Sequence, residues 1–348
     1  MLISLQNIFL KSVFLSFLIF TLIFFINLIG IFIYRKIAIK RGIVANPNFR
    51  ALHETPVPSG GGVVFVLIFI LVVSFLWFFN LLSNKLLFIY GIGGFLAFLL
   101  GFIDDINDIG ARKKLFLQII ISLIPVLILF DQIILRVLWA PSWLILPLVS
   151  LFLVWMINAY NFMDGVDGMA ASGAIFASGS IALSLILLDG SYDTIVLLLL
   201  LMTSIGAFLI FNWPPASIFM GDSGSVFLGY IFGVFILLTT IQHELSIWTW
   251  IIVFGYFISD TSMTLITRLI IVQKWYGGHR SHAYQNLARI NNSHLKVTMV
   301  VLIYNLVWLL PLTIVSVKNP DLAMYSSFFA IIPALVVSYK YGPLLSSA

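Results

Sequence analysis

The 348-residue sequence has no cysteine and little charge, since Asp, Glu, Lys and Arg make up only 9% of it. Without cysteine, disulfide bonds and thiolate metal sites are excluded. The scarcity of charge excludes a soluble domain, because 61% of the residues are hydrophobic and the mean hydropathy is +1.13. The composition therefore predicts an all-α polytopic membrane protein, with a single membrane domain over residues 1–348.

Apolar runs long enough to cross the roughly 30 Å hydrocarbon core of a bilayer recur along the sequence. Eleven helical spans are predicted, at residues 12–34, 62–82, 86–103, 115–130, 143–162, 169–188, 194–211, 225–241, 247–271, 297–316 and 324–340. The fourth is short and contains Pro125, and its existence sets the side on which every later loop lies. The sequence contains no internal repeat or soluble insertion.

Basic residues are distributed unevenly between the loops. If the first helix runs inward, one face collects the loops at 35–61, 104–114, 163–168, 212–224 and 272–296 and the C-terminus. When Arg268 and Lys340 are counted with their nearest ends, that face holds 14 of the 18 Lys and Arg residues, and the other four are Lys11, Lys85, Arg136 and Lys318. The positive-inside rule then places this face in the cytoplasm and the N-terminus outside.

The longest segment without Lys or Arg, residues 137–267, contains two motifs built on carboxylates. One runs from Asn161 to Gly168 and includes Asp164 and Asp167, and the other is the Phe-Met-Gly-Asp that ends at Asp222. Carboxylates at the edge of a hydrocarbon core need a counter-charge or water. Because no base is near in the sequence, a bound cation is favoured, typically Mg²⁺ with a phosphate-bearing substrate. Alternatively, the Asp-Gly pairs only form turns between helices.

A third acidic motif ends the third span. Asp104 and Asp105 are adjacent, and Arg112, Lys113 and Lys114 follow soon after. Adjacent carboxylates repel each other, so this motif also favours a metal and phosphate site. The alternative is a solvated loop followed by a basic residue cluster that only sets the membrane topology.

Two other loops on the same face contain histidine. The loop at 50–62 contains His53, two prolines and three consecutive glycines, which allow the main chain to approach a ligand or a neighbouring helix. The loop at 277–285 contains His279, Arg280 and His282. On a helix the two histidines would share one face, where they could bind pyrophosphate or protonate a leaving phosphate. Contact with lipid head groups is the alternative for this loop.

Asp260 is the one acid clearly inside a predicted span, at 247–271. With a rise of 1.5 Å per residue it would lie about 16 Å from the end of that helix at Ile271. Such a residue is a functional candidate by default, but pairing with Arg268 or a neighbouring helix explains it equally well.

Together, the motifs resemble those of the polyprenyl-phosphate N-acetylhexosamine-1-phosphate transferases, in the same order over nearly the whole chain. The resemblance implies Mg²⁺ as the cofactor, with Mn²⁺ as an alternative. It implies catalytic roles for Asp104, Asp105, His279 and His282, substrate contacts for Asp164, Asp167, Arg280 and His53, and metal ligation by Asp222 and Asn161. Ser281 departs from the family pattern, which often has another histidine there.

The resemblance also implies the reaction. A GlcNAc-type or 6-deoxy N-acetylhexosamine 1-phosphate would pass from a UDP-sugar to undecaprenyl phosphate, releasing UMP and starting a lipid-linked cell-envelope glycan such as an O-antigen. The expected location is a bacterial plasma membrane, and the expected partners are these substrates and membrane lipids, with no nucleic acid and the oligomeric state open. Direct displacement is favoured, because a phosphate monoester has its second pKa near 6 and is mostly dianionic at neutral pH. A covalent aspartyl intermediate is the alternative.

Two other classes of protein remain as alternatives. The segment from Asp164 to Ala171 resembles the start of the CDP-alcohol phosphatidyltransferase signature, but Ser172 stands where that signature has Arg. A secondary transporter would place acids near the membrane midplane and contain internal repeats, and only Asp260 fits that pattern.

Overall fold

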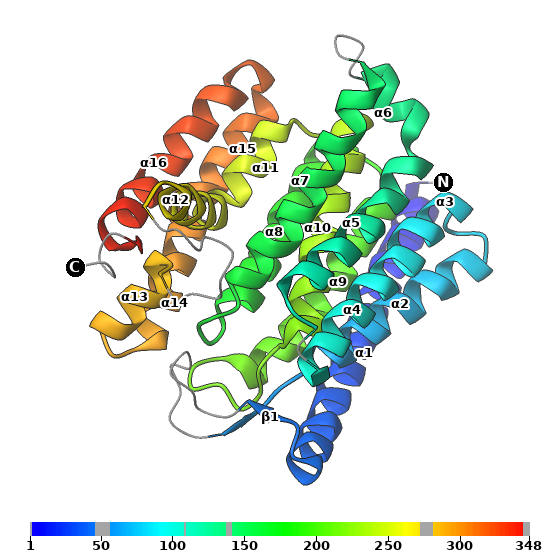
Figure 1. Cartoon of the computed structure of the whole chain (residues 1–348). Helices are drawn as coiled ribbons and strands as arrows, with labels where there is room; N and C mark the ends of the chain where they lie inside the picture. Colours follow the sequence, from blue (N-terminus) through cyan, green and yellow to red (C-terminus); the bar gives the residue numbers. More distant parts are fainter. Residues whose placement is uncertain (1, 46–55, 108, 137–140, 272–280, 344–348) are drawn as a thin grey trace.

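The computed structural model describes residues 2–45, 56–107, 109–136, 141–271 and 281–343. In these residues the chain is almost entirely helical, and long helices run side by side in a bundle (Figure 1). The first half contains α1 (Leu2–Arg41), α2 (Gly62–Phe78), α3 (Asn84–Leu86), the π-helix η1 (Leu87–Gly93), α4 (Gly94–Asn107), α5 (Ala111–Ile128), α6 (Phe130–Arg136), α7 (Ser142–Phe162) and α8 (Met169–Leu187). The second half contains α9 (Tyr192–Asn212), α10 (Asp222–Ile241), α11 (Ile247–Val253), α12 (Gly255–Ile271), α13 (Ala283–Ile290), α14 (His294–Tyr304), the π-helix η2 (Asn305–Leu309), α15 (Leu310–Lys318), the 3₁₀-helix η3 (Pro320–Leu322) and α16 (Ala323–Tyr341).

Each of the eleven predicted spans corresponds to a helix, a run of joined helices or a bent pair. Among the described residues, eight continuous helical stretches are long and apolar enough to cross a membrane, and two bent pairs each pass the same test. The remaining span is α2, a shorter apolar helix of 17 residues. The prediction of an all-α polytopic membrane protein is therefore confirmed.

Both bent pairs contain a sharp break. α5 and α6 meet at 75°, close to Pro125, and α11 and α12 meet at 85° around Phe254. In Figure 1 α12 is seen nearly end-on, whereas α7 lies along the bundle. Asp260 and Ile271 both lie on α12, beyond the break, so the bend leaves the expected separation of about 16 Å along the helix unchanged but turns this stretch away from the direction of α11.

α10 is the central helix of the bundle. Every residue from Ser223 to Thr239 is buried, and α10 packs against α2, α4 and α7. A helix that is hydrophobic on all sides is stable only when other helices surround it. The approach of α4 is very close, since a Cβ added at Gly101 would lie 2.1 Å from the carbonyl oxygen of Asp222. Glycine at this position brings the end of α4 against the start of α10.

The ends of the helices that carry the motifs gather at the lower end of the bundle in Figure 1. There β1 (Val44–Ala45) and β2 (Val57–Pro58) form a short antiparallel pair. Next to β2, Gly61 donates its N–H to the Phe219 carbonyl at 2.8 Å, and Gly62 donates to Met220 at 2.9 Å. In the structure this glycine loop therefore packs against a neighbouring segment, which was one of the two explanations for its composition.

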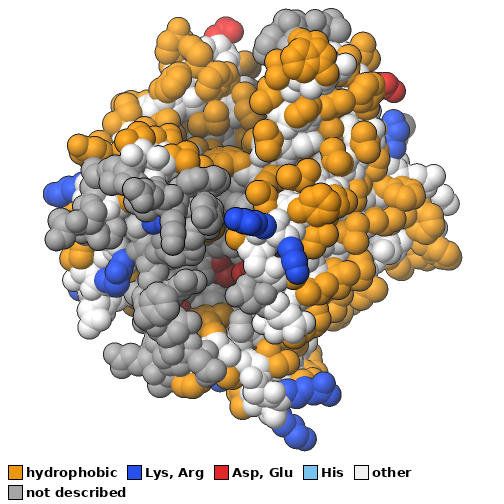
Figure 2. All heavy atoms as spheres, in the orientation of Figure 1, with side chains coloured by type: hydrophobic (Ala, Val, Ile, Leu, Met, Phe, Trp, Pro, Cys, Tyr) orange, Lys and Arg blue, Asp and Glu red, His pale blue; other side chains and the backbone are white. Residues whose placement is uncertain are grey.

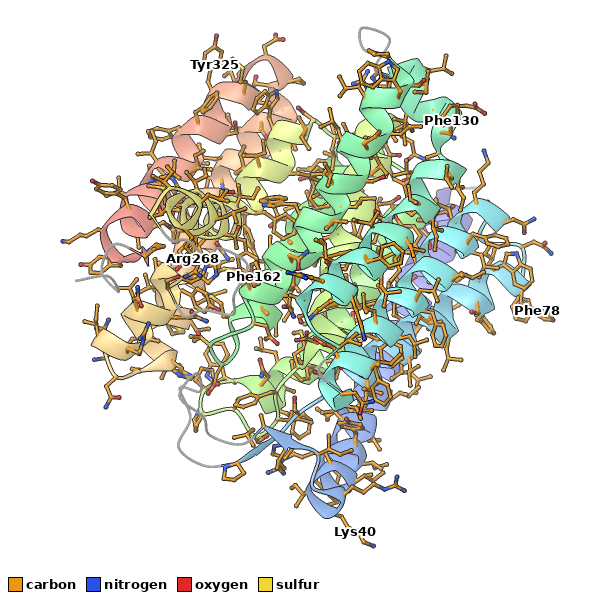
Figure 3. All side chains as sticks on the ribbon, in the orientation of Figure 1. Lys40, Phe78, Phe130, Phe162, Arg268 and Tyr325 are labelled. Carbon is orange, nitrogen blue, oxygen red and sulfur yellow. The ribbon has the colours of Figure 1, made fainter. Side chains whose placement is uncertain are left out.

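The two ends of the molecule differ in what they carry. Lys40, near the end of α1, lies at one end of the bundle, and Phe130 and Tyr325 lie at the opposite end (Figure 3). Hydrophobic side chains cover most of the face in Figure 2, and acidic side chains are visible in a recess near its centre. A bilayer would stabilise such a surface, because apolar side chains face outward over most of the bundle.

Candidate active site

The neighbouring acids Asp104 and Asp105 point to different partners, because adjacent residues on a helix are about 100° apart. Asp105 accepts the backbone N–H groups of Asp222 at 2.8 Å and Ser223 at 3.0 Å, the first two residues of α10. Asp104 accepts the N–H of Ile109 at 3.0 Å. Asp105 thus caps the central helix, and Asp104 is left to face other side chains.

Lys114 joins α4, α5 and α10 at this point. Its Nζ lies 2.7 Å from Asp104 Oδ2 and also pairs with Asp222 Oδ2. The expectation that no base compensates the acids of residues 137–267 is therefore wrong for Asp222. Lys114 lies outside that segment, but the short turn between α4 and α5 folds it back onto both carboxylates. Lys114 therefore does more than set the membrane topology, which was one explanation for the basic residues 112–114.

Asn161 links α7 to the same cluster. Its Nδ2 donates to Asp222 Oδ1 at 2.9 Å and to Ser225 Oγ at 2.8 Å. The predicted proximity of Asn161 and Asp222 is therefore present, while their role as metal ligands stays a prediction.

The turn between α7 and α8 places Asp164 beside these acids. Withdrawal from water raises the pKa of the Asp164 carboxyl well above its usual value, and the charges of Asp222, Asp105 and Asp167 raise it further. Carboxylates that repel one another in this way are typical of sites that bind a cation or transfer protons.

Asp167 is held more firmly by its own surroundings. It accepts the Ala216 N–H at 3.0 Å, and His294 Nδ1 lies 3.1 Å from its Oδ1. Its backbone carbonyl accepts the hydroxyl of Thr298 at 2.8 Å. Asp167 thus connects the motif turn to α14, and sequence reasoning identified neither His294 nor Thr298.

His282 lies beyond the end of α7 and is only 2% exposed. Its Nδ1 lies 3.2 Å from Asp260 Oδ1, and its ring stacks at a tilt near Phe162, with centroids 5.7 Å apart. His282 directly precedes α13, so Asp260 pairs with a neighbouring segment, as one explanation anticipated. The catalytic role of His282 stays a prediction. His53, His279 and Arg280, also predicted site residues, lie outside the described residues.

The acid cluster, formed by Asp104, Asp105, Asp164 and Asp222, offers the oxygen ligands that a hard divalent cation prefers. In the described part of the chain no three His, Cys, Asp or Glu side chains form a ready metal site. However, oxygens of Asp104 and Asp222 converge on the Lys114 ammonium, which marks a cation position, and the Asn161 amide donates to the second oxygen of Asp222. Carboxylate and amide oxygens are ligands that Mg²⁺ accepts.

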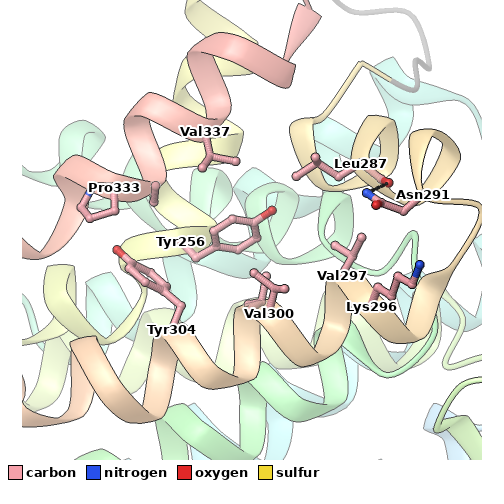
Figure 4. Close-up of a pocket in the computed structure, with 11 residues that line it drawn as sticks. Tyr256, Leu287, Asn291, Lys296, Val297, Val300, Tyr304, Pro333 and Val337 are labelled. Carbon is pink, nitrogen blue, oxygen red and sulfur yellow. Dashed lines mark hydrogen bonds between the residues drawn. The ribbon is translucent and has the colours of Figure 1, made fainter.

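A separate groove lies between α12, α13, α14 and α16 (Figure 4). Its lining is almost entirely apolar, with Asn291 and Lys296 at one end and Tyr256 and Tyr304 further along. The described site residues do not line it, so the groove is distinct from the acid cluster.

The fold and the cluster together define a polytopic membrane protein with a polar, partly exposed acidic site at one end of an apolar helix bundle. Comparison with known proteins identifies the family. The profile of glycosyl transferase family 4 matches residues 87–240, which include Asp104, Asp164 and Asp222. The chain belongs to this family of polyprenyl-phosphate sugar-1-phosphate transferases.

Two relatives illustrate the similarity. A probable undecaprenyl-phosphate N-acetylglucosaminyl 1-phosphate transferase of Bacillus subtilis (strain 168) is 29% identical over 317 residues, which cover 89% of this chain and 87% of that protein. A phospho-N-acetylmuramoyl-pentapeptide-transferase of Prochlorococcus marinus (strain MIT 9312) is 34% identical over 277 residues, which cover 71% of this chain and 74% of that protein.

Proposed function

We propose that the protein transfers an N-acetylhexosamine 1-phosphate, of the GlcNAc type or a 6-deoxy relative, from a UDP-sugar to undecaprenyl phosphate and releases UMP. The product would start a lipid-linked cell-envelope glycan. The observation that carries this proposal is the convergence of Asp104 and Asp222, from α4 and α10, on the Lys114 ammonium, with Asn161 of α7 donating to the second oxygen of Asp222. A GlcNAc-type donor is supported by the Bacillus relative, whose similarity extends over more of both chains than that of the Prochlorococcus relative.

The reaction would be a direct displacement at phosphorus. An oxygen of the lipid phosphate attacks the phosphorus that bears the sugar, a new P–O bond forms, and the bond to the bridging oxygen breaks so that this oxygen leaves with UMP. Because the lipid phosphate is mostly dianionic at neutral pH, no general base is required. A covalent aspartyl intermediate is the alternative that kinetics would have to exclude.

The residues at the cluster have distinct proposed roles. Asp222 and Asn161 would hold Mg²⁺ or Mn²⁺, which would supply a Lewis acid to withdraw charge from the diphosphate. Lys114 offers a second positive charge for a phosphate oxygen, and Asp104 positions it through their ion pair. Asp105 orients the start of α10, while Asp164 and Asp167 would contact the nucleotide sugar. His279, Arg280 and His282 would stabilise the departing UMP, and His53 would contact substrate.

The orientation in the membrane completes the proposal. The end that carries the acid cluster would face the cytoplasm of a bacterium, where UDP-sugars are made, and the N-terminus would lie outside. This is supported by the excess of Lys and Arg in the loops of that end. The lipid phosphate would stay in the bilayer while the nucleotide sugar enters from water.

The test is UMP release by the purified protein with undecaprenyl phosphate, Mg²⁺ and a panel of UDP-N-acetylhexosamines. UDP-N-acetylmuramoyl-pentapeptide and a CDP-linked donor are added as separate arms, and samples without lipid or with EDTA are the controls. We expect UMP only with lipid and metal, and only with a GlcNAc-type or 6-deoxy donor. Release of CMP would support the phosphatidyltransferase alternative. No turnover with any donor, from protein shown to be folded, would contradict the proposal and leave a transporter.

A further inference from the structure

Asp260 is completely buried yet fully engaged with α13. It accepts the N–H groups of Ala283 and Tyr284, each at 3.1 Å, and the hydroxyl of Thr264 at 3.2 Å. Ala283 and Tyr284 are the first two residues of α13, so their N–H groups have no partner within the helix. The Asp260 carboxylate therefore fixes both the position and the direction of the start of α13.

Tyr284 transmits this position to the turn between α7 and α8. Its hydroxyl donates to the Phe162 carbonyl at 2.6 Å and accepts the Gly165 N–H at 3.0 Å, so one side chain holds both sides of Asp164. The contact is close, since a Cβ added at Gly165 would lie 2.4 Å from the Tyr284 hydroxyl oxygen. Glycine in the Asp-Gly pair is thus required for this packing, beyond its usual role in turns.

We propose that Tyr284, anchored by Asp260, is a positioning residue for the transfer reaction, because its hydroxyl fixes the turn that carries Asp164 next to Asp105 and Asp222. This inference rests on the proposed function. The turn itself has weak internal support at Asp164, whose N–H donates to the Asn161 carbonyl at 3.3 Å. The Tyr284 hydroxyl supplies two shorter bonds, to Phe162 and Gly165 on either side of Asp164.

Tyr284→Phe tests the inference, because it removes one oxygen and keeps the ring. Tyr304→Phe is the matched control, since the Tyr304 hydroxyl also donates to a backbone carbonyl, that of Ala330, but away from the acid cluster. Tyr284→Phe loses the bonds with Phe162, Gly165 and Gln285, whereas Tyr304→Phe loses the one to Ala330, so the unfolding temperature should fall in both variants and further in Tyr284→Phe. Misplacement of a reacting group lowers turnover steeply, so we expect kcat to fall by about 10- to 100-fold in Tyr284→Phe and by less than about twofold in Tyr304→Phe.

Hydrogen exchange at residues 162–168 gives a readout that does not depend on turnover. Exchange there should be faster in Tyr284→Phe than in the wild type and unchanged in Tyr304→Phe. Equal exchange in all three proteins, or equal kcat in the two variants, would overturn the inference alone. A wild-type protein that releases no UMP would instead overturn the proposed function and, with it, the catalytic part of the inference.

Asp260→Asn completes the experiment as a double-mutant cycle with Tyr284→Phe. If Asp260 acts through Tyr284, the loss of kcat in the double variant should be close to that of the more severe single variant. Multiplied losses would show that the two residues act separately, which would remove Asp260 from the proposal.

Discussion

Asp105 and Asp260 perform the same structural task in two different regions of the molecule. Each carboxylate projects from one helix and accepts the first two backbone N–H groups of another, α10 for Asp105 and α13 for Asp260. In both places a negative charge meets the positive end of a helix dipole and satisfies donors that the helix leaves unpaired.

The two regions differ in what surrounds the capping carboxylate. Around Asp260 the cluster is closed, since the side chains of Asp260 and His282 are 0% and 3% exposed. Around Asp105, the neighbouring Asp104, Lys114 and Asp222 side chains are 15%, 15% and 30% exposed. A capping carboxylate therefore orders a helix in either setting. Of these two regions, the one around Asp105 is open and keeps additional charged groups within reach of a ligand.

Removing the charge of Asp222 should have the largest effect on activity and would test whether the open region is the active site. Asp222→Asn keeps the size of the side chain and the backbone N–H that Asp105 accepts, so the protein should remain folded. We expect turnover, measured as UMP release, to fall by at least about a hundredfold, a typical loss for a group that stabilises charge in a transition state. Near-normal turnover would remove Asp222 from the site.

The two capping carboxylates should differ when each is replaced by Asn, which can accept only one of the two N–H groups well. At the buried Asp260 no water can replace the lost bond, so the free energy of unfolding should fall by about 1–3 kcal/mol. At Asp105, which is exposed, the loss should resemble that of an ordinary helix cap, about 0.5–2 kcal/mol. Denaturation measured in the same detergent would compare them.

Turnover should depend on both adjacent acids of the open region, the exposed cluster around Asp105. Asp105→Asn and Asp104→Asn are each expected to lose turnover by about a hundredfold, with little loss of stability for Asp104, because Lys114 keeps its contact with Asp222. Normal turnover in both variants would contradict the assignment of this region.

The spans could be predicted because apolar runs of about 20 residues have few alternatives in a membrane protein. The pairing of Lys114 with Asp222 does not follow from residues 137–267 alone, because Lys114 lies outside that segment. A signal was present, since Asp104 and Lys114 flank a short turn and therefore face each other on antiparallel helices. The bend between α11 and α12 had no comparable signal, because neither Phe254 nor Gly255 interrupts the apolar pattern. Without that bend, pairing of Asp260 with a neighbouring helix could be anticipated, but not that the partner is the start of α13.

The raised pKa of Asp164 gives a smaller effect that concerns stability. When the pKa of an acid is higher in the folded state than the value of about 3.9 expected on unfolding, the folded state binds more protons. Stability should therefore fall as pH rises from about 4 through the raised pKa. Asp164→Asn removes this dependence, so its unfolding temperature should exceed that of the wild type by a few degrees at pH 8 and approach it at pH 4. Parallel curves would contradict the raised pKa.

The smallest effect is expected at the end of the bundle opposite the acid cluster, where we expect no catalytic function. Arg136 Nη1 lies 2.7 Å from His243 Nε2 at an exposed position. Exposed polar contacts contribute little, so Arg136→Gln should change stability by less than about 0.5 kcal/mol and leave kcat and KM within error. A clear loss of turnover in this variant would mean that charge at the motif-free end also matters, and the contrast between the two ends would no longer locate the active site.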